Sequence, residues 1–219
     1  GSLKYYISIM DEDKESDSLF NNLKVSSRPI IIAASTREGE EAKLLAAFKS
    51  VLEKIPGVLF IVVPRHPERF DRVFSDLKNS GLICARRSSI SNLSDDIQVI
   101  VGDSVGEMIS YYSVAKIAFV GGSLVDTGCH NVLEPAALSL PILVGPSQYN
   151  FAQICERLEK AGGLLTIRDE NELSEKIVDL LEHKSKRLRM GEIAKEEVLA
   201  NQKALPTLIK IIEEKLPIN

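Results

Sequence analysis

Ile30–Ala34, with the sequence IIIAA, begins a regular alternation of short apolar runs and longer amphipathic segments. Six further apolar runs follow along the chain: Val58–Val63 (VLFIVV), Leu82–Ala85 (LICA), Ile97–Val101 (IQVIV), Ile117–Gly121 (IAFVG), Ile142–Val144 (ILV) and Leu164–Ile167 (LLTI). Helical spacing occupies most of the gaps: Glu40–Lys54, Pro67–Asn79, Glu107–Val114, Pro135–Ser139, Ala152–Ala161 and three charged segments from Glu170 to the end. Strands that are apolar on both faces and separated by helices are typical of a parallel sheet covered on each side. The pattern predicts an α/β fold, a Rossmann-like doubly wound parallel sheet, over residues 29–219.

The composition favours a soluble globular chain over several other classes. Of 219 residues, 44% are hydrophobic and 26% are charged, which supplies a core and argues against wholesale disorder. The net charge is −4 and the pI about 5.5, whereas a general nucleic-acid binder needs a basic face. No apolar run approaches the roughly 18 residues of a membrane span, and residues 1–20 lack the pattern of a secretory signal. We therefore expect one large soluble domain without a nucleic-acid partner.

The first 28 residues differ from the rest of the chain. Asp11–Asp17 (DEDKESD) is an acidic run without apolar periodicity. We therefore expect residues 1–28 to form a polar arm or a connection to another domain, and residues 29–219 to form the folded domain.

The sequence gives little support for a metal site or a disulfide framework. The histidines and cysteines are few and widely spaced: His66, His130, His183, Cys84, Cys129 and Cys155. The odd cysteine count without C-x-x-C spacing fits a reducing compartment. The carboxylates of Asp11-Glu12-Asp13 belong to the polar arm, so we expect no metal there either.

In doubly wound sheets, ligands bind in the crevice outside the carboxyl ends of the strands. Glycines, small hydroxyls, Arg, His and Glu are concentrated after the predicted strands: Ser35–Gly39 (STREG), Pro64–Arg69 (PRHPER), Gly102–Glu107 (GDSVGE), Gly122-Ser123, Gly128–Pro135 (GCHNVLEP), Gly145-Pro146 and Asn150-Phe151. This convergence predicts a ligand site at one edge of the sheet.

Two of these loops have a structural and a ligand-binding interpretation. Ser35 and Glu38 match a capping box at a helix start, where exposed amides can also contact a ligand. Gly121-Gly122-Ser123 suits a tight turn, and it also suits the approach of backbone amides to a phosphate. No G-x-G-x-x-G and no P-loop pattern occurs, which disfavours nicotinamide cofactors and P-loop chemistry.

Glu134 is expected at a helix cap, because the following Pro135 suits the first helical position. Caps favour Ser, Thr, Asp or Asn, so a glutamate there suits a ligand contact, for which two ribose hydroxyls are natural donors. An alternative helix start at Asn131, with Glu134 closing a capping box, remains open.

Arg65, His66 and Arg69 form a basic group in a loop held by two prolines. Surface salt bridges are one interpretation of these side chains. Three donors directed at the ligand edge favour the other interpretation, which is anion binding.

Gly102–Gly106 (GDSVG) fits the G-x-S-x-G nucleophile elbow of serine hydrolases, with Ser104 as the nucleophile. The acid and the histidine should then follow on later strand ends, but Asp126 and His130 stand four residues apart in one predicted loop. No HGGG-like oxyanion segment precedes the motif. A hydrolase is therefore retained only as an alternative.

The loop sequences, taken together, resemble those of the Kdo transferases. The matching motifs are Gly1–Tyr5 (GSLKY), Ser35–Glu41 (STREGEE), Pro64–Phe70 (PRHPERF), Gly102–Met108 (GDSVGEM), Gly121–Ser123 (GGS), Gly128–Ala136 (GCHNVLEPA) and Asn150-Phe151. They occur in the same order and span the chain. Departures from the family pattern include Arg37, where the family often has histidine, and Val105, where it has methionine.

This resemblance implies the C-terminal half of a GT-B glycosyltransferase. Kdo transferases move 3-deoxy-D-manno-octulosonic acid (Kdo) from its CMP donor onto a lipid A precursor in lipopolysaccharide biosynthesis, with inversion and without a metal. In that family the N-terminal domain carries the acceptor site, the general base and the association with the cytoplasmic face of the bacterial inner membrane. The resemblance therefore implies a soluble chain that binds the CMP-sugar donor, needs no cofactor, holds no catalytic residue and is inactive alone.

The donor-binding residues implied by the resemblance are Ser35, Thr36, Glu38, Pro64, Arg65, His66, Gly102, Val105, Gly106, Gly122, Ser123, His130, Asn131 and Glu134. Of these, Glu134 is expected at the ribose hydroxyls and Arg65 at the nucleotide or the sugar carboxylate. Ser123, His130 and Asn131 are expected around the phosphate and sugar, and the backbone of residues 101–106 at the cytosine. Two further alternatives remain: the nucleotide half of another GT-B enzyme, such as a UDP-sugar transferase or epimerase, and a non-catalytic Rossmann-like module.

Overall fold

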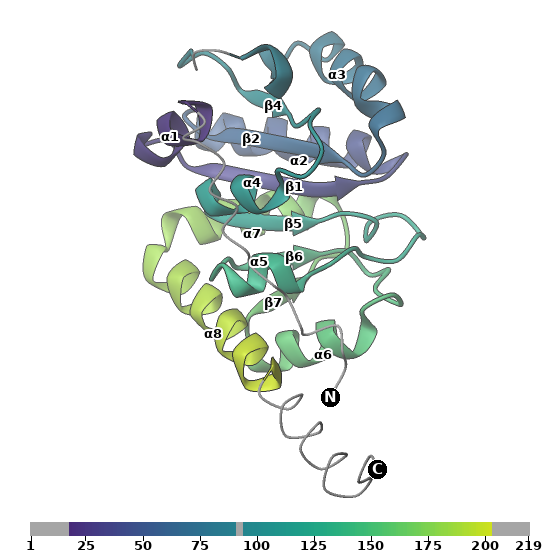
Figure 1. Ribbon diagram of the computed structural model, residues 1–219, viewed down its shortest axis with the longest axis vertical. Coiled ribbons are helices and arrows are strands. Elements are labelled where there is room, and N and C mark those ends of the chain that lie inside the picture. The colour runs from purple at the N-terminus through teal and green to yellow at the C-terminus, as the bar shows by residue number, and fades with distance from the viewer. Residues whose placement is uncertain (1–17, 91–93, 203–219) are drawn as a thin grey trace, which may run out of the picture.

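The computed structural model describes residues 18–90 and 94–202, which form a seven-stranded sheet with helices on both faces (Figure 1). All paired strands are parallel, and their order is β3-β4-β2-β1-β5-β6-β7. The strands are β1 (Ile30–Thr36), β2 (Leu59–Pro64), β3 (Cys84–Arg86), β4 (Val99–Val101), β5 (Ile117–Val120), β6 (Ile142–Val144) and β7 (Leu164–Thr166). The prediction of an α/β fold with a doubly wound parallel sheet is confirmed.

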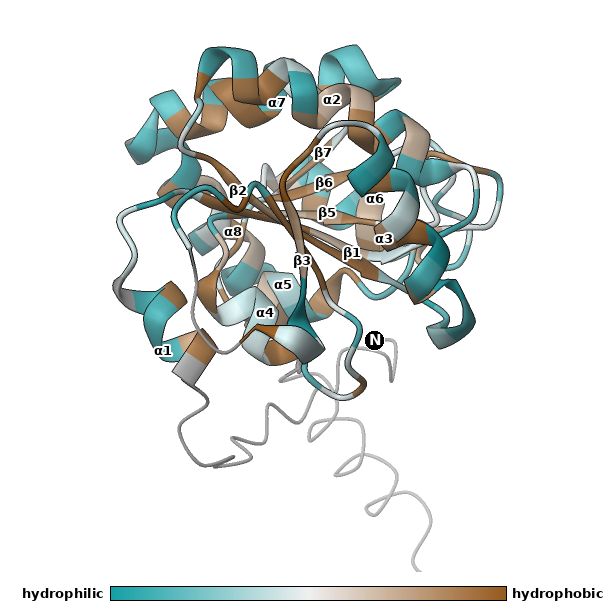
Figure 2. Cartoon of the chain, turned by 90° about the horizontal axis from the view of Figure 1, so that it is seen from above, coloured by the Kyte–Doolittle hydropathy of each residue, from teal (hydrophilic) through white to brown (hydrophobic). Residues whose placement is uncertain are grey.

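Eight α-helices of the described residues accompany the sheet: α1 (Ser18–Val25), α2 (Glu40–Lys54), α3 (Phe70–Asn79), α4 (Met108–Val114), α5 (Leu133–Ala137), α6 (Ala152–Ala161), α7 (Glu170–Glu182) and α8 (Lys184–Gln202). Short 3-10 turns stand at Pro67–Arg69 and Arg87–Ser89. Figure 2 shows α2 and α7 on one side of the sheet and α1, α4 and α5 on the other.

The sheet carries a hydrophobic layer on each face because successive strand side chains point to opposite sides. In β1, Ile31 packs in the layer under α2 and α7, and Ile32 packs in the layer under α1 and α4. Phe48 of α2 stacks on Phe60 of β2, with ring centroids 3.9 Å apart, and both rings are fully buried. Burial of such a ring contributes roughly 2–3 kcal/mol, so these layers supply much of the driving force for folding.

The packed domain begins earlier in the chain than the sequence suggested. Leu19, Phe20 and Leu23 of α1 are buried against α4, and the ring of Phe20 meets Tyr111 edge-on at 5.3 Å. The sequence predicts a polar arm or a connection to another domain over residues 1–28, but a helix whose apolar side chains are buried belongs to the folded domain. The acidic run Asp11–Asp17 lies outside the described residues.

The order of strands creates a topological switch point at the centre of the sheet. From β1 the chain passes to β2 and to the edge strand β3, returns to β4 between them, and then crosses to the other side of β1 with β5. Ile31 of β1 aligns with Phe60 of β2 on one side and with Ile117 of β5 on the other. In doubly wound sheets, ligands bind in the crevice between the loops on either side of such a point, which here are the loops that follow β1 and β5.

Most predicted elements have nearly the predicted bounds. The helices over Glu40–Lys54 and Ala152–Ala161 and the strand over Ile142–Val144 coincide with α2, α6 and β6. Two of the three charged segments after Glu170 are α7 and α8, and the third lies outside the described residues. Within the described ranges, no helix combines the length and the apolar character needed to cross a bilayer.

Candidate functional site

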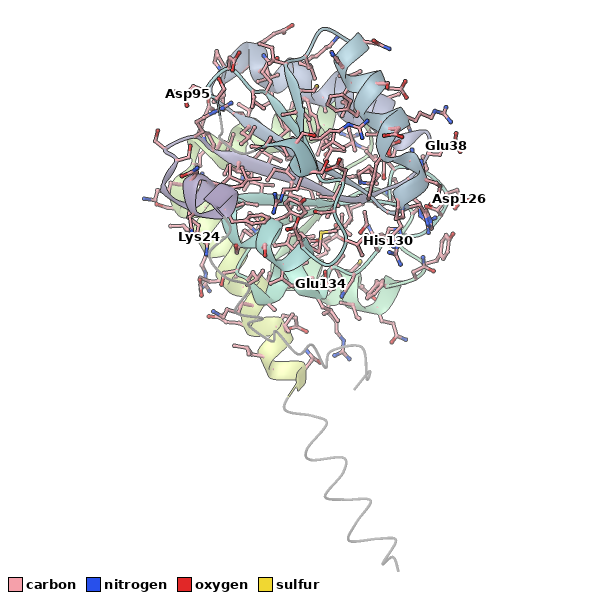
Figure 3. All side chains as sticks on the ribbon, turned by 45° about the horizontal axis from the view of Figure 1, so that its top comes forward. Lys24, Glu38, Asp95, Asp126, His130 and Glu134 are labelled. Atoms are coloured by element: carbon pink, nitrogen blue, oxygen red, sulfur yellow. The ribbon has the colours of Figure 1, made fainter. Side chains whose placement is uncertain are left out.

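The loops after β1, β2, β4 and β5 gather at the carboxyl ends of the strands. Figure 3 shows Glu38, Asp126 and His130 at this end of the molecule, and Lys24 and Asp95 at the opposite end. The sequence prediction that the polar and glycine-rich loops share one edge of the sheet is therefore confirmed by the topology.

Arg37, His66 and His130 make direct contact at the switch point, and we call these three residues the strand-end cluster. Arg37 Nε donates to His130 Nε2 at 3.0 Å, and Arg37 Nη1 lies 2.6 Å from His66 Nε2. A guanidinium has only donors, so both imidazoles accept through Nε2 and carry their proton on Nδ1. The cluster thus presents one guanidinium and two imidazole rings at the mouth of the crevice.

Burial lowers the pKa of His130 from 6.5 to about 4, and the positive charges of Arg37 and Arg65 and the neighbouring His66 add to this effect. His130 is therefore neutral at pH 7. The exposed Arg65 also acts on Glu134, whose pKa it lowers against the larger raising effect of burial. The charge of Arg65 therefore lies near both the strand-end cluster and Glu134, although these groups come from three different loops.

Glu134 is half-buried in the first turn of α5. Asn131 Nδ2 donates to Glu134 Oε1 at 2.9 Å, and Asn131 Oδ1 accepts from the backbone N–H of Leu133 at 3.0 Å. The expected helix start with Glu134 at the cap is therefore wrong. Helix α5 begins at Leu133, and the side chain of Asn131 accepts the N–H of that first helical residue. Pro135 is tolerated three residues into the helix, since the first four N–H groups of a helix have no intrahelical partner.

The expected capping box of Ser35 and Glu38 does not form. Helix α2 begins one turn later, at Glu40, after Gly39 in the left-handed region at φ 84°. Ser35 itself has φ 56° at the end of β1, a backbone conformation that is uncommon for a residue with a side chain. Glu38 instead pairs with Arg72 on the surface at 2.7 Å.

Glu40 is the residue of this edge that the sequence did not single out. Its side chain is fully buried, and both carboxylate oxygens accept backbone N–H groups. Oε1 accepts from Ser123 and Leu124 at 3.1 and 2.9 Å, and Oε2 accepts from Gly122 and Arg37 at 2.9 and 3.1 Å. Burial raises the pKa of Glu40, and these backbone donors oppose that effect. The carboxylate therefore ties the loop after β5 to the loop after β1.

Several predicted donor-binding residues are buried supports of the crevice. Ser123 is fully buried. Its hydroxyl donates to Val120 O at 2.6 Å, and its backbone N–H donates to the carboxylate of Glu40. Thr36 is also fully buried and donates to Glu41 at 2.8 Å. The remaining buried members of the predicted set are Pro64, Gly102 and Gly122. The structure thus places these residues beneath the surface of the site.

The side chain of Arg69 is bonded within the protein. It pairs with the carboxylate of Glu41 at 2.8 Å and donates to Thr36 O at 3.1 Å, with only 15% of its side chain exposed. The expectation that Arg69 belongs to an anion-binding group is therefore wrong, because its charge is already neutralised within the protein. Arg65 and His66 remain at the edge.

Residues 102–106 form the loop that follows β4, and this loop ends in two exposed residues. Val105 is 79% exposed, and Gly106 has φ 85°. Ser104 Oγ donates to Glu107 and lies 2.8 Å from the hydroxyl of Tyr111. Its hydroxyl therefore contacts a carboxylate and a phenol, whereas a nucleophile elbow requires a histidine.

The donors at this edge are arranged for an anion more than for a metal. Across residues 18–90 and 94–202, no group of three or more His, Cys, Asp or Glu side chains could hold a metal ion. Asp11-Glu12-Asp13 lies outside these ranges. The partly exposed Arg37, the exposed Arg65, the neutral His130 and the half-buried Glu134 are suited to a phosphate next to a polyhydroxylated group.

The family described as glycosyl transferases group 1 matches residues 21–197. The 3-deoxy-D-manno-octulosonic acid transferase of Haemophilus influenzae is 38% identical over 220 aligned residues, which cover 100% of this chain and 52% of that enzyme. The transferase of the same name from Bordetella pertussis is 33% identical and covers 98% of this chain and 50% of its own length. The chain therefore spans about half the length of these curated relatives.

Among solved structures, the C-terminal CMP-Kdo binding domain of WaaA from Acinetobacter baumannii is 33% identical, with a TM-score of 0.78, and the match covers 82% of this chain and 94% of that domain. A structure from Listeria monocytogenes that carries the name UDP-N-acetylglucosamine 2-epimerase matches 95% of this chain and 50% of its own, with a TM-score of 0.61 and 13% identity, which shows the fold alone. The resemblance read from the loop motifs is thereby confirmed. The chain belongs to the glycosyl transferases of group 1 and is a homologue of the 3-deoxy-D-manno-octulosonic acid transferases.

Proposed function

We propose that this chain is the donor-binding domain of a Kdo transferase and that it binds CMP-Kdo. The observation that carries the proposal is the convergence of the strand-end cluster, Arg65 and Glu134 on the crevice between β1 and β5. The same crevice is the general ligand position of doubly wound sheets. The similarity to a domain named for CMP-Kdo binding supports the choice of ligand.

Each part of the donor has a matching group at the crevice. Arg37 and Arg65 supply positive charge for the single phosphate, and neutral His130 can hydrogen-bond to a phosphate or sugar oxygen. The Glu134 carboxylate, oriented by Asn131, is suited to accept from the two ribose hydroxyls. The loop of residues 102–106 follows β4 at the same edge of the sheet, and we expect its backbone to contact the cytosine.

In the proposed reaction, Kdo passes from CMP to a lipid A precursor with inversion at the donor carbon. The leaving CMP carries modest charge, which arginines and backbone donors stabilise without a metal. A general base must remove the proton of the acceptor hydroxyl. Following the resemblance to the Kdo transferases, we assign the acceptor site, the base and the contact with the inner membrane to the other half of the full-length enzyme, and we expect this chain alone to be inactive.

The proposal is tested by calorimetric titration of this chain with CMP, UMP and AMP. We expect saturable binding selective for CMP. Preference for UMP would instead indicate the nucleotide half of a UDP-sugar GT-B enzyme. The structure that carries the name UDP-N-acetylglucosamine 2-epimerase shares this fold. Absence of binding to all three nucleotides would favour a non-catalytic module.

Glu134→Ala tests the assignment of the ribose contact. Loss of two hydrogen bonds to a carboxylate should weaken CMP binding by roughly 10- to 100-fold. Glu53→Ala, an exposed carboxylate at the far end of α2, is the matched control and should bind CMP as the wild type does. Unchanged affinity of Glu134→Ala would remove Glu134 from the ribose site.

A further inference from the structure

Glu40 occupies a position that a bound anion would otherwise fill. Three successive backbone amides, those of Gly122, Ser123 and Leu124, point at its carboxylate, and the amide of Arg37 completes the set. Consecutive backbone N–H groups that converge in this way form an anion-binding concavity. Here the anion is a side chain of the protein, so these amides are already used and any phosphate must be met by other donors.

Only an ionised carboxylate satisfies this arrangement. Each of the two Glu40 oxygens accepts two backbone N–H groups, and the three bonds from Gly122, Ser123 and Leu124 are buried. A glutamine of the same size would replace one oxygen by an NH2 group that faces two donors, which leaves two amides without an acceptor. The identity of the residue at position 40 therefore decides the geometry of both loops that it joins.

The two loops joined by Glu40 carry Arg37 and His130, two members of the strand-end cluster. The amide of Arg37 is held by Glu40, and the Arg37 side chain contacts His130 and His66. On the other loop, the amide of His130 donates to Gly121 O at 3.0 Å, directly before the amides that Glu40 holds. One buried carboxylate thus sets the distance between the Arg37 backbone and the His130 backbone, 93 residues apart in the sequence.

We propose that Glu40 is a positioning residue, which holds Arg37 and His130 in register so that the strand-end cluster can bind the phosphate of the donor. The phosphate role rests on the proposed function above, whereas the effect of Glu40 on the cluster does not. Glu40 touches no ligand, because its side chain is fully buried and its oxygens are taken by the protein.

The first test is an NMR pH titration of the histidines in wild type and Glu40→Gln, with Glu53→Gln as the matched control on the same helix. The chain has three histidines, so each can be followed, and the exposed His183 serves as an internal reference. In the wild type His130 should titrate at about 4. In Glu40→Gln its pKa should rise by about one pH unit or more, because displacement removes it from Arg37, from Arg65 and from its buried site.

The direction of this shift separates positioning from plain electrostatics. Removal of a negative charge would by itself lower the pKa of a nearby imidazole, so only displacement of the cluster raises it. A pKa of His130 that stays constant or falls in Glu40→Gln overturns the proposal, whatever the chain binds. The same rise in Glu53→Gln would also overturn it, because the effect would then not be specific to position 40.

The second test compares CMP with cytidine, which lacks the phosphate. Glu40→Gln should bind CMP about tenfold more weakly, as expected when one charge-assisted contact is lost, and should bind cytidine as the wild type does. Equal weakening of both ligands would show a merely structural role and would overturn the proposal. If the wild type binds neither nucleotide nor nucleoside, the proposed function fails, and the histidine titration still decides the role of Glu40.

A measurement on the wild type covers the case in which Glu40→Gln does not fold. Hydrogen exchange should show the amides of Gly122, Ser123 and Leu124 as slow as those of the central strands, because they are bonded to a buried carboxylate. Rapid exchange of these three amides would show that the carboxylate does not hold the loop, and it would overturn the proposal.

Discussion

Replacement of His130 by glutamine should make the fold less sensitive to acid. Burial and the charges of Arg37 and Arg65, together with His66, hold the pKa of His130 at about 4, against 6.5 for an unperturbed histidine. The unfolded chain therefore takes up the proton first as the pH falls, and the folded state loses stability. A glutamine can still accept a hydrogen bond from Arg37 and does not titrate in this range.

The size of the effect follows from the two pKa values. Because the pKa in the folded state is lowered, the loss is absent above about pH 7.5 and grows as the pH falls through 6.5 toward 4. Linkage gives about 2 kcal/mol of lost unfolding free energy at about pH 5 and roughly 3 kcal/mol once the pH is below 4. This is a large fraction of the stability of a typical domain.

The assay is urea unfolding of wild type and His130→Gln at about pH 8 and about pH 5. The titrations of Glu40 and Glu134 are common to both proteins, so they cancel when the two pH dependences are compared. Wild type should lose about 2 kcal/mol more than the variant between the two pH values. An equal loss in both proteins would refute the reasoning, because His130 would then titrate at the same pH in the folded and the unfolded chain.

Three further substitutions test the packing around the crevice by urea unfolding. Gly121→Ala should cost about 2 kcal/mol or more, because the new Cβ would lie 2.6 Å from Ser35 O, and a neutral result would contradict this close approach. Phe48→Ala should cost about 3–5 kcal/mol, because it removes a buried ring stacked on Phe60, and a loss below about 1 kcal/mol would show that the layer is loosely packed. Arg69→Ala should cost about 2 kcal/mol, because it leaves a largely buried carboxylate without its charged partner, whereas a change within about 0.5 kcal/mol would place this pair with ordinary surface salt bridges.

The fold was predictable because its signal is local and repeated. Apolar runs such as Ile30–Ala34 and Val58–Val63 are buried on both faces, so their hydrophobicity is continuous and easily seen in the sequence. The position of the site followed from the fold, since the carboxyl ends of parallel strands must share one edge. Helix α1 was missed because its apolar residues Leu19, Phe20 and Leu23 follow an acidic run and form only two turns.

The interior of the site was less predictable because it depends on contacts between distant residues. Glu40 stands where an exposed acidic residue is usual, at the start of a helix, and its burial results from a loop 82 residues away. Arg69 reads as a free cation until the fold brings Glu41 beside it. The signal available in the sequence was the Glu40-Glu41 pair directly after the first strand loop, but it does not distinguish a buried acceptor from a solvated one.

The position of β1 at the centre of the sheet has a consequence for how the protein folds. Strands β1 to β4 come from residues 30–101 and can assemble from neighbouring βαβ units, whereas β5 to β7 come from residues 117–166. The two halves pair only along β1 and β5, which is a contact of high sequence separation and therefore slow to form. Arg37 and His130 lie on opposite sides of that seam. The crevice is consequently complete only when the two halves have paired, and a half-folded chain with native strands on either side would have no binding site.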